Sequence, residues 1–385
     1  MKQGWTYKKL GEVCEVTDYV ANGSFATLRE NVTYYNEPNY ALLVRLADYS
    51  SNFDSSKFVY VDKHSYDFLS KSSLFGGEII MSNVGSIGKC FICPKLAEHM
   101  TIGPNSLLIR TPNNKFYLYY FKSKTFQKDL ISITSSATLS KFNKTQLKTL
   151  SLPSPPLPEQ QRIVSRLDSA FAHIDELKAN AEKQVNEARA LFQKALSKAM
   201  EPKEGWEEKK FGDVCSYHKE QGHYKDMRYI GMEHMESGTG ELLNTISSDA
   251  VLSSSFKFNK GEVLYGRLRP YLRKVYIAEF DGCCSTEVFP IRSKTIKSGF
   301  IKYWLLSDEI TNRINETSAG CRMPRGNMNE VKNFPFFYPK DQDQQRIVSR
   351  LDALSKNVKA LEENQRKVIA ECDALKQALL RKVFE

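Results

Sequence analysis

The sequence lacks any long hydrophobic run. No apolar stretch approaches the ~18 residues that a membrane-spanning helix needs, and the opening Met1-Lys2-Gln3-Gly4-Trp5 has no apolar core of a secretory signal. We therefore expect a cytoplasmic protein with no membrane association. Histidine is also scarce, with 6 among 385 residues, and the scattered positions of these residues indicate neither a metal site nor a catalytic triad.

Motifs for catalysis are missing as well. Ser154-Pro-Pro-Leu157 resembles the amino-methyltransferase signature, but there an aromatic residue at the fourth position stacks on the flipped base. No glycine-rich turn precedes it to hold S-adenosylmethionine, so we expect a lead into a helix. Gly85-Ser-Ile-Gly-Lys89 is too short for a P-loop and favours a turn between strands. Glu176 and Lys178 lack the upstream Pro-Asp of a nuclease core. We expect no catalytic residue, no cofactor and no metal.

Cysteine and charge give weaker indications. Cys90 and Cys93 form a lone pair without the second pair or the histidines of a zinc finger, so buried free thiols are expected. Lys and Arg number 55 against 45 Asp and Glu, a net charge of +10. Such an excess fits a polyanionic partner, but it is too common among proteins to identify one.

The chain contains an internal duplication. Gln160-Gln-Arg-Ile-Val-Ser-Arg-Leu-Asp168 recurs without change as Gln344-Gln-Arg-Ile-Val-Ser-Arg-Leu-Asp352, 184 residues later. Gly77-Glu-Ile-Ile80 matches Gly261-Glu-Val-Leu264 at the same offset. Nine consecutive identities exclude coincidence, and they indicate two modules of one architecture.

A second pair of motifs opens the two copies. Gly4-Trp5 with Lys8-Lys9-Leu10-Gly11 matches Gly205-Trp206 with Lys209-Lys210-Phe211-Gly212, at an offset of 201 residues. The first copy therefore carries extra residues early in its variable part. Shared edges around divergent interiors are expected of two modules with one task and two different targets.

A long helix follows each variable part. Pro158 and Glu159 supply a helix start, and no Pro or Gly interrupts the apolar pattern that follows. At ~38 residues each helix would be ~57 Å long, so we expect an antiparallel coiled coil rather than a helix lying on its own domain. The seam positions are Ile163, Leu167, Ala170, Ile174, Leu177, Ala181, Val185, Ala188, Phe192, Ala195 and Ala199, then Ile347, Leu351, Leu354, Val358, Leu361, Ile369, Cys372, Leu379 and Val383.

The variable parts predict mixed α/β domains. Short apolar runs bounded by turn residues indicate strands, and two aromatic-rich segments, 116–121 and 300–306, indicate helices over the sheets. The predicted strands lie at 77–81, 89–93, 106–110, 261–265 and 286–292. The fold class is α+β, with domains at 1–155 and 202–338 and long helices at 156–201 and 339–385.

Candidate DNA-binding residues lie in two loops of each copy. Arg267-Leu-Arg-Pro-Tyr-Leu-Arg273 interleaves guanidinium groups with an aromatic ring, which suits phosphate contacts and reading of guanine O6 and N7. The corresponding first-copy loop, 83–89, is less charged, so the two copies would read different bases; ordinary solvated surface is the alternative for any single residue. The candidates are Asn83, Lys89, Lys141, Asn143, Lys144, Lys257, Arg267, Arg269, Tyr271, Arg273, Lys274, Arg322, Arg325 and Asn327.

These features together resemble the specificity subunit of type I restriction-modification systems. The motifs that carry the resemblance are Pro156-Leu-Pro-Glu-Gln-Gln-Arg-Ile-Val164, its partial repeat Gln344-Gln-Arg-Ile-Val348, the two Gly-Trp openings and Gly261-Glu-Val-Leu-Tyr-Gly-Arg-Leu-Arg-Pro270. The second helix is preceded by Pro339-Lys-Asp-Gln-Asp343 in place of Pro-Leu-Pro-Glu, which leaves its local cap geometry open.

The resemblance implies a subunit without chemistry of its own. Two target-recognition domains would each bind one half of a bipartite, asymmetric double-stranded DNA target, and the helices would set the spacer. Two N6-adenine methyltransferase subunits would dock on the helices, and motor-nuclease subunits would join them. A transcription regulator is more often a homodimer, a coiled-coil scaffold leaves the basic domains unexplained, and a fused enzyme needs a catalytic domain on another chain.

Overall fold

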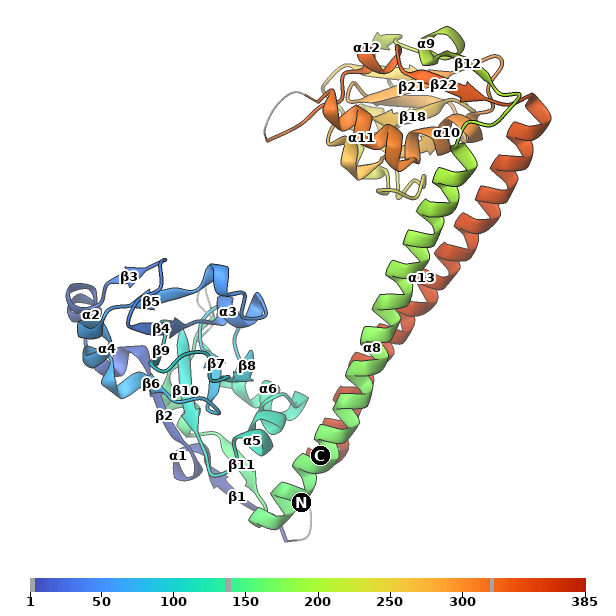
Figure 1. Ribbon diagram of the computed structural model, residues 1–385. Coiled ribbons are helices and arrows are strands. Elements are labelled where there is room, and N and C mark those ends of the chain that lie inside the picture. The colour runs from blue at the N-terminus through green and yellow to red at the C-terminus, as the bar shows by residue number, and fades with distance from the viewer. Residues whose placement is uncertain (1–3, 136–139, 319–321) are drawn as a thin grey trace. The chain divides into compact units, whose positions relative to one another are not determined.

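The chain divides into two units that share one architecture. The computed structural model describes residues 4–135, 140–318 and 322–385. The first unit comprises the residues up to 179 together with 368–385, and the second comprises 180–367 (Figure 1). Each unit therefore holds one α/β domain and a section of both long helices.

The first domain contains a four-stranded and a five-stranded sheet. The four-stranded sheet is antiparallel, and in the five-stranded sheet β4 and β9 run parallel. A two-stranded ribbon, β1 (Thr6–Lys9) with β11 (Ser151–Ser154), leads to the long helix. The sheets consist of β2 (Glu15–Asp18), β10 (Ser106–Arg110), β7 (Ile79–Ser82) and β8 (Cys90–Ile92), and of β3 (Tyr34–Tyr35), β5 (Val59–Val61), β4 (Ala41–Val44), β9 (Met100–Ile102) and β6 (Ser73–Leu74).

The second domain repeats this plan except for one edge strand, because β3 pairs with β5, whereas β14 pairs with β17, the counterpart of β6, on the opposite edge. Its five-stranded sheet also has one parallel pair, β15 with β20, and its ribbon is β12 (Glu207–Lys210) with β22 (Pro335–Tyr338). The sheets consist of β13 (Ser216–Tyr217), β21 (Val288–Arg292), β18 (Val263–Gly266) and β19 (Val275–Ile277), and of β14 (Gln221–Gly222), β17 (Ser255–Phe258), β20 (Gly282–Ser285), β15 (Arg228–Ile230) and β16 (Ile246–Ser247).

Short helices surround these sheets. The aromatic segments are helical as predicted, and both are buried against their four-stranded sheet. Helix α2 follows β2 in the first domain, where the sequence predicts extra residues. The helices are α1 (Leu10–Val13), α2 (Phe25–Asn31), α3 (Leu46–Ser50), α4 (Lys63–Phe68), α5 (Asn114–Phe121), α6 (Lys124–Ser132), α7 (Lys144–Lys148), α9 (Phe211–Val214), α10 (Ser298–Leu306), α11 (Asp308–Glu316) and α12 (Met328–Val331).

The duplicated Gly-Glu motif forms the same turn in both domains. Gly77 and Gly261 have φ angles of +93° and +89°, a left-handed conformation that glycine adopts without steric cost. The carboxylate of Glu78 accepts hydrogen bonds from two backbone N–H groups just upstream, both at 2.8 Å, and that of Glu262 accepts one at 3.0 Å. Both glutamates are buried, so this motif is structural and sets the start of β7 and β18.

The two long helices are antiparallel and packed together, as predicted. They are α8 (Leu157–Met200) and α13 (Asp341–Phe384), each of 44 residues and thus longer than expected. Within the first unit, Lys178 Nζ lies 3.0 Å from Asp373 Oδ1, and within the second, Gln365 Nε2 donates to Gln184 Oε1 at 2.8 Å. Rising numbers in α8 thus meet falling numbers in α13. No helix among the described residues is long and apolar enough to span a membrane.

The ends of both long helices contribute to the domain cores. Leu380 and Phe384, at the end of α13, are buried in the first domain, where the Phe384 ring lies 5.5 Å from that of Phe116. Leu196, near the end of α8, is equally buried in the core of the second domain. Each domain is therefore completed by the last turns of the helix that arrives at it.

The middle of the predicted seam is wrong in one respect. Leu177 is 56% exposed, although Ile174 and Ala181 on either side of it in the seam are 4% and 3% exposed. In the second unit, two polar residues of α13, Glu362 and Gln365, are buried. The predicted seam has two consecutive four-residue steps around Ala181, and each advances the apolar stripe by about 40°. Leu177, one such step before the buried Ala181, therefore lies beside the contact with the partner helix and not within it.

The repeated nonapeptide has a structural role at both ends. Its first residue, Gln160 or Gln344, donates to a proline carbonyl five residues earlier, at 2.9 and 3.0 Å. Its last residue, Asp168 or Asp352, accepts a hydrogen bond from a tyrosine hydroxyl of α5 or α10. The second helix start therefore has the same geometry as the first although its preceding residues differ.

Two smaller expectations are also confirmed. Cys90 and Cys93 are buried free thiols, and burial raises the pKa of both to about 12. Residues 85–89 form the turn between β7 and β8, and Ser154-Pro-Pro-Leu157 leads from β11 into α8.

Candidate nucleic-acid interface

The loop between β18 and β19 carries the densest set of predicted DNA-binding residues. A 3₁₀ turn, η6 (Pro270–Leu272), lies between Arg269 and Arg273, whose φ angles are +52° and +50°. Left-handed backbone is strained for arginine and persists only where the surroundings enforce it. The Arg269 N–H donates to the carbonyl of Pro324 at 2.7 Å. This anchored loop presents Arg269 and Tyr271 on the surface, with Tyr271 54% exposed.

A carboxylate joins two of the predicted arginines. Glu287 accepts from Arg267 Nε at 2.8 Å and from Arg325 Nε at 2.8 Å. Burial favours the neutral acid, but the hydrogen bonds from Arg325 and Arg267 outweigh it and hold the pKa of Glu287 below its ordinary value. The structure thus brings together two residues that are 58 positions apart in the sequence (267 and 325).

Two lysines and two aromatic rings extend this cluster, and none of them is among the residues predicted from the sequence. Lys219 Nζ and Arg267 Cζ lie 4.9 and 5.3 Å from the ring centroid of Phe289, and Lys332 Nζ lies 5.1 Å from that of Tyr217. Burial lowers the pKa of Lys219, and the positive charges of Lys332 and Arg267 lower it further. A signal was present, because the 201-residue offset pairs Lys219 with an acid, Asp18.

Other predicted residues of the second unit are engaged by protein groups. Arg273 forms an ion pair with Asp308 at 2.6 Å. Lys274 Nζ donates to a backbone carbonyl at 2.6 Å, and burial lowers its pKa. Lys257 Nζ lies 3.4 Å from a glutamate oxygen, and Arg322 is exposed. Among the predicted arginines, Arg269 and Arg322 are exposed, whereas the side chains of Arg267 and Arg325 are 32% and 42% exposed.

The two predicted asparagines near the long helices are helix caps. Asn143 Oδ1 accepts from the N–H of Gln146 at 2.9 Å at the start of α7. Asn327 Oδ1 accepts from the N–H of Asn329 at 3.1 Å at the start of α12. A capping side chain stabilises the helix start, so DNA contact by these residues stays a prediction beside a defined structural role.

The first unit holds its candidates in a different way. Asn83 Nδ2 donates to the carbonyl of Phe142 at 3.1 Å, and its buried Oδ1 has no partner in the described chain. Lys144 forms an ion pair with Asp18 at 3.0 Å. Lys141 is exposed, and its backbone pairs with Val84, just after the end of β7. The first unit therefore has fewer accessible cations at this position.

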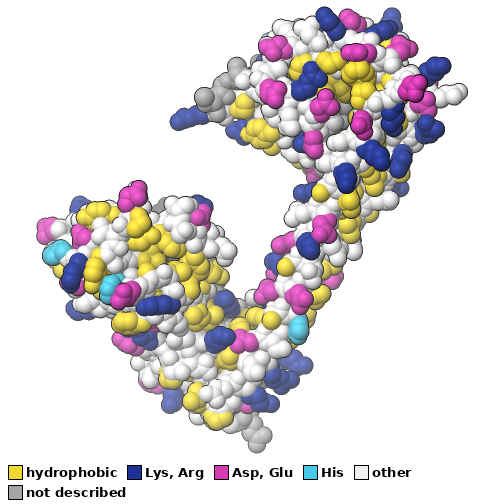
Figure 2. All heavy atoms as spheres, viewed as in Figure 1, with side chains coloured by type: hydrophobic (Ala, Val, Ile, Leu, Met, Phe, Trp, Pro, Cys, Tyr) yellow, Lys and Arg dark blue, Asp and Glu magenta, His cyan; other side chains and the backbone are white. Residues whose placement is uncertain are grey.

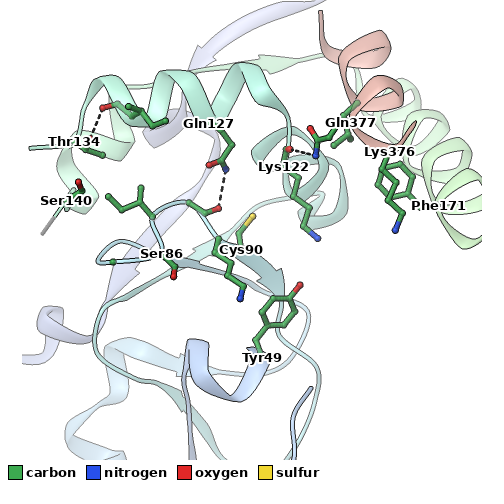
Figure 3. Close-up of a pocket in the computed structure, with 16 residues that line it drawn as sticks. Tyr49, Ser86, Cys90, Lys122, Gln127, Thr134, Ser140, Phe171, Lys376 and Gln377 are labelled. Atoms are coloured by element: carbon green, nitrogen blue, oxygen red, sulfur yellow. Dashed lines mark hydrogen bonds between the residues drawn. The ribbon is translucent and has the colours of Figure 1, made fainter. Parts of the chain in front are cut away.

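Lys89 lines a cavity of about 800 Å³ within the first unit. Its ammonium group donates to Ser50 Oγ at 3.0 Å and lies 5.5 Å from the ring centroid of Tyr49. Figure 3 shows Lys122 and Lys376 with their amino groups on the same side of this cavity. Lys376 forms an ion pair with Asp175, so Lys89 and Lys122 are the lysines of this cavity whose charge would favour an anion such as a phosphate group.

Charge elsewhere on the surface is mixed. Figure 2 shows basic and acidic side chains interspersed over the helices and the second domain on the face in view. The described residues include no group of three or more His, Cys, Asp and Glu able to hold a metal. Recognition of a polyanion would therefore depend on local clusters, above all the one around Glu287.

Comparison with known proteins assigns the family. The sequence model described as "Type I restriction modification DNA specificity domain" matches residues 2–187 and 203–371. The type I restriction enzyme EcoDI specificity subunit of Escherichia coli is 32% identical over 45% of this chain and 39% of its own length. A putative type I restriction enzyme MjaX specificity subunit of Methanocaldococcus jannaschii is 25% identical over 91% and 87%. The EcoKI specificity subunit of Escherichia coli is 21% identical over 100% and 89%.

Solved structures agree in fold. A chain from a study of complex assembly and conformational transition of the type I R-M system aligns with a TM-score of 0.75 at 18% identity, over 100% of this chain and 98% of that one. The HsdS subunit from Thermoanaerobacter tengcongensis aligns with a TM-score of 0.53 at 18% identity, over 100% and 97%. Since the family model covers both copies, the chain belongs to the type I restriction-modification DNA specificity family, as a non-catalytic specificity subunit.

Proposed function

We propose that each domain of this specificity subunit reads one half of a bipartite, asymmetric DNA target. The recognition domains would be residues 1–155 and 202–338, and the long helices at 156–201 and 339–385 would fix the spacer. The observation that carries the proposal is that one framework, whose four-stranded sheet has the same strand order in both domains, holds unlike polar side chains at the same loop. Two equal frameworks with unequal readers are suited to two unequal half-sites.

The proposed partner subunits bind the long helices. Two copies of an N6-adenine methyltransferase would dock on α8 and α13, and motor-nuclease subunits would join this assembly. The repeat-related Leu191 and Leu375 are 66% and 49% exposed on these helices, and exposed leucines at equivalent positions supply two similar apolar contacts. The exposed cations of both domains, with Lys89 and its neighbours, would contact DNA phosphates.

A domain exchange tests the proposal. The chain, with residues 202–338 replaced by the equivalent domain of another member of the family, is expressed with its methyltransferase, and methylated adenines are mapped in the host genome. We expect one half of the methylated sequence to change while the other half and the spacer stay. A changed first half, or a pattern independent of this chain, would contradict the assignment.

A further inference from the structure

At the end of β7 in the first domain and of β18 in the second, three residues from separate segments come together in the same way. In the second domain, Arg267 N–H donates to the carbonyl of Glu287 at 2.9 Å, and the segment carrying Arg325 pairs with this loop. In the first domain, Asn83 N–H donates to the carbonyl of Asn105 at 3.3 Å, and the segment carrying Lys141 pairs in the same way. The backbone contacts are the same, so the side chains can be compared position by position.

The side chains at this position differ in chemistry. The second domain has two guanidinium groups held by one carboxylate, with Glu287 22%, Arg267 32% and Arg325 42% exposed. The first domain has Asn83, Asn105 and Lys141 at these positions, and the side-chain amide of Asn83 donates to a backbone carbonyl. An arginine pair on one scaffold and none on the other is a difference in what can be read.

The carboxylate determines which edge of each guanidinium is available. Both arginines bind Glu287 through Nε. In Arg325, Nη1 also donates to a backbone carbonyl at 3.3 Å. In Arg267, neither terminal nitrogen has a hydrogen-bond partner within 4–135, 140–318 and 322–385. Two parallel donors at the end of a fixed guanidinium match O6 and N7 of guanine in the major groove.

We infer that Arg267 reads a guanine in the second half-site and that Glu287 is the positioning residue that aims it. Arg325 balances the second carboxylate oxygen and keeps Glu287 in place. Fixing a flexible side chain before binding lowers the entropy that recognition costs. The first half-site is not read by arginine at the equivalent position. This inference rests on the proposed function, because it specifies how one of the two readers works.

The test compares base preference in reconstituted methyltransferase complexes. Duplexes with each half-site randomised in turn are methylated by the wild-type complex and by complexes with R267K or E287Q, and the preferred bases are read from methylated products. For R267K, which keeps the charge but not the two parallel donors, we expect the preference for one guanine of the second half to fall roughly tenfold or more. E287Q is expected to weaken the same preference, with the first half unchanged.

Further measurements separate positioning from folding. Since E287Q removes a negative charge, affinity for non-specific DNA should not fall, whereas a damaged domain would lose both specific and non-specific binding. The matched control is E309Q, which removes a carboxylate from an exposed pair with Arg313 on α11 (3.8 Å) and should leave base preference unchanged. Unaltered guanine preference in R267K or E287Q overturns the inference. Absence of sequence preference in the wild-type complex would instead reject the proposed function.

Discussion

Two tyrosine–aspartate hydrogen bonds link the domain helices to the long helices. Tyr119 donates to Asp168 at 2.5 Å and Tyr303 donates to Asp352 at 2.6 Å, and Lys115 adds an ion pair to Asp168 at 2.8 Å. Burial alone raises the pKa of Asp168, but the hydrogen bonds from Lys115 and Tyr119 outweigh it and lower the pKa. The last residue of the repeated motif is thus a charged anchor between domain and helix.

This anchor predicts a pH-dependent stability difference. A carboxyl group whose pKa is lower in the folded than in the unfolded chain stabilises the fold at pH values above its ordinary pKa, which is 3.8 for Asp. This stabilisation is lost as the pH falls through the pKa of the folded state. Asp168→Asn should therefore cost about 1 kcal/mol near neutral pH. The difference from wild type should shrink below about pH 4, as measured by urea unfolding at several pH values.

The control for this measurement is an exposed carboxylate. Asp67 on α4 pairs with Lys63 at the surface, where its side chain is 58% exposed. Asp67→Asn should change the free energy of unfolding little at any pH, because exposed ion pairs contribute little. An Asp168→Asn deficit that stays constant from neutral pH to about pH 3 would show that the carboxylate charge is not what stabilises.

At the scale of elements, the ends of the long helices complete the domains. Leu380 is 1% exposed within the first core, whereas Leu375, on the same helix, is 49% exposed. Leu380→Ala should lower the free energy of unfolding by about 2–5 kcal/mol, because it removes buried surface and leaves a cavity. Leu375→Ala should change it by less than about 0.5 kcal/mol. Equal effects in chemical denaturation would show that the end of α13 does not stabilise the domain.

At the scale of the whole molecule, the helices are expected to determine the spacer between half-sites. The insertion points are Ala181 in α8 and Ile369 in α13, which lie in the sequence between the residues of the contacts Lys178–Asp373 and Gln184–Gln365. Four residues inserted after each add ~6 Å and ~400° of turn, close to one full turn. The methylated sequence should then keep both halves, with a spacer longer by one to two base pairs at ~3.4 Å each.

Inserting two residues at the same points is the control, since it rotates each apolar face by ~200°. That variant should lose helix packing and methylation together. A four-residue variant that folds, judged by circular dichroism, and still methylates only the original spacer would mean that the helices do not position the readers.

Local sequence patterns were sufficient to predict most of the helices and strands. The strand at β18, the helices α5 and α10 and both long helices are encoded by short-range periodicity and turn residues, so they are visible in a linear sequence. The exposure of Leu177 could not be predicted, because the apolar pattern of one helix does not show which of its positions the partner helix covers. The burial of Leu380 and Phe384 in a domain more than 200 residues away in sequence was likewise hidden.

The sequence by itself determined the duplication, the two mixed domains, the paired helices and the family resemblance, because each is written in local or repeated patterns. Only the tertiary structure decided how the candidate residues combine. In the folded chain Glu287 binds both Arg267 and Arg325, and Lys219 lies in the same cluster beside the Phe289 ring. Asn143 and Asn327 are helix caps. Side-chain hydrogen bonds between distant segments depend on strand order and loop conformation, and neither is set by the residues next to them in the chain.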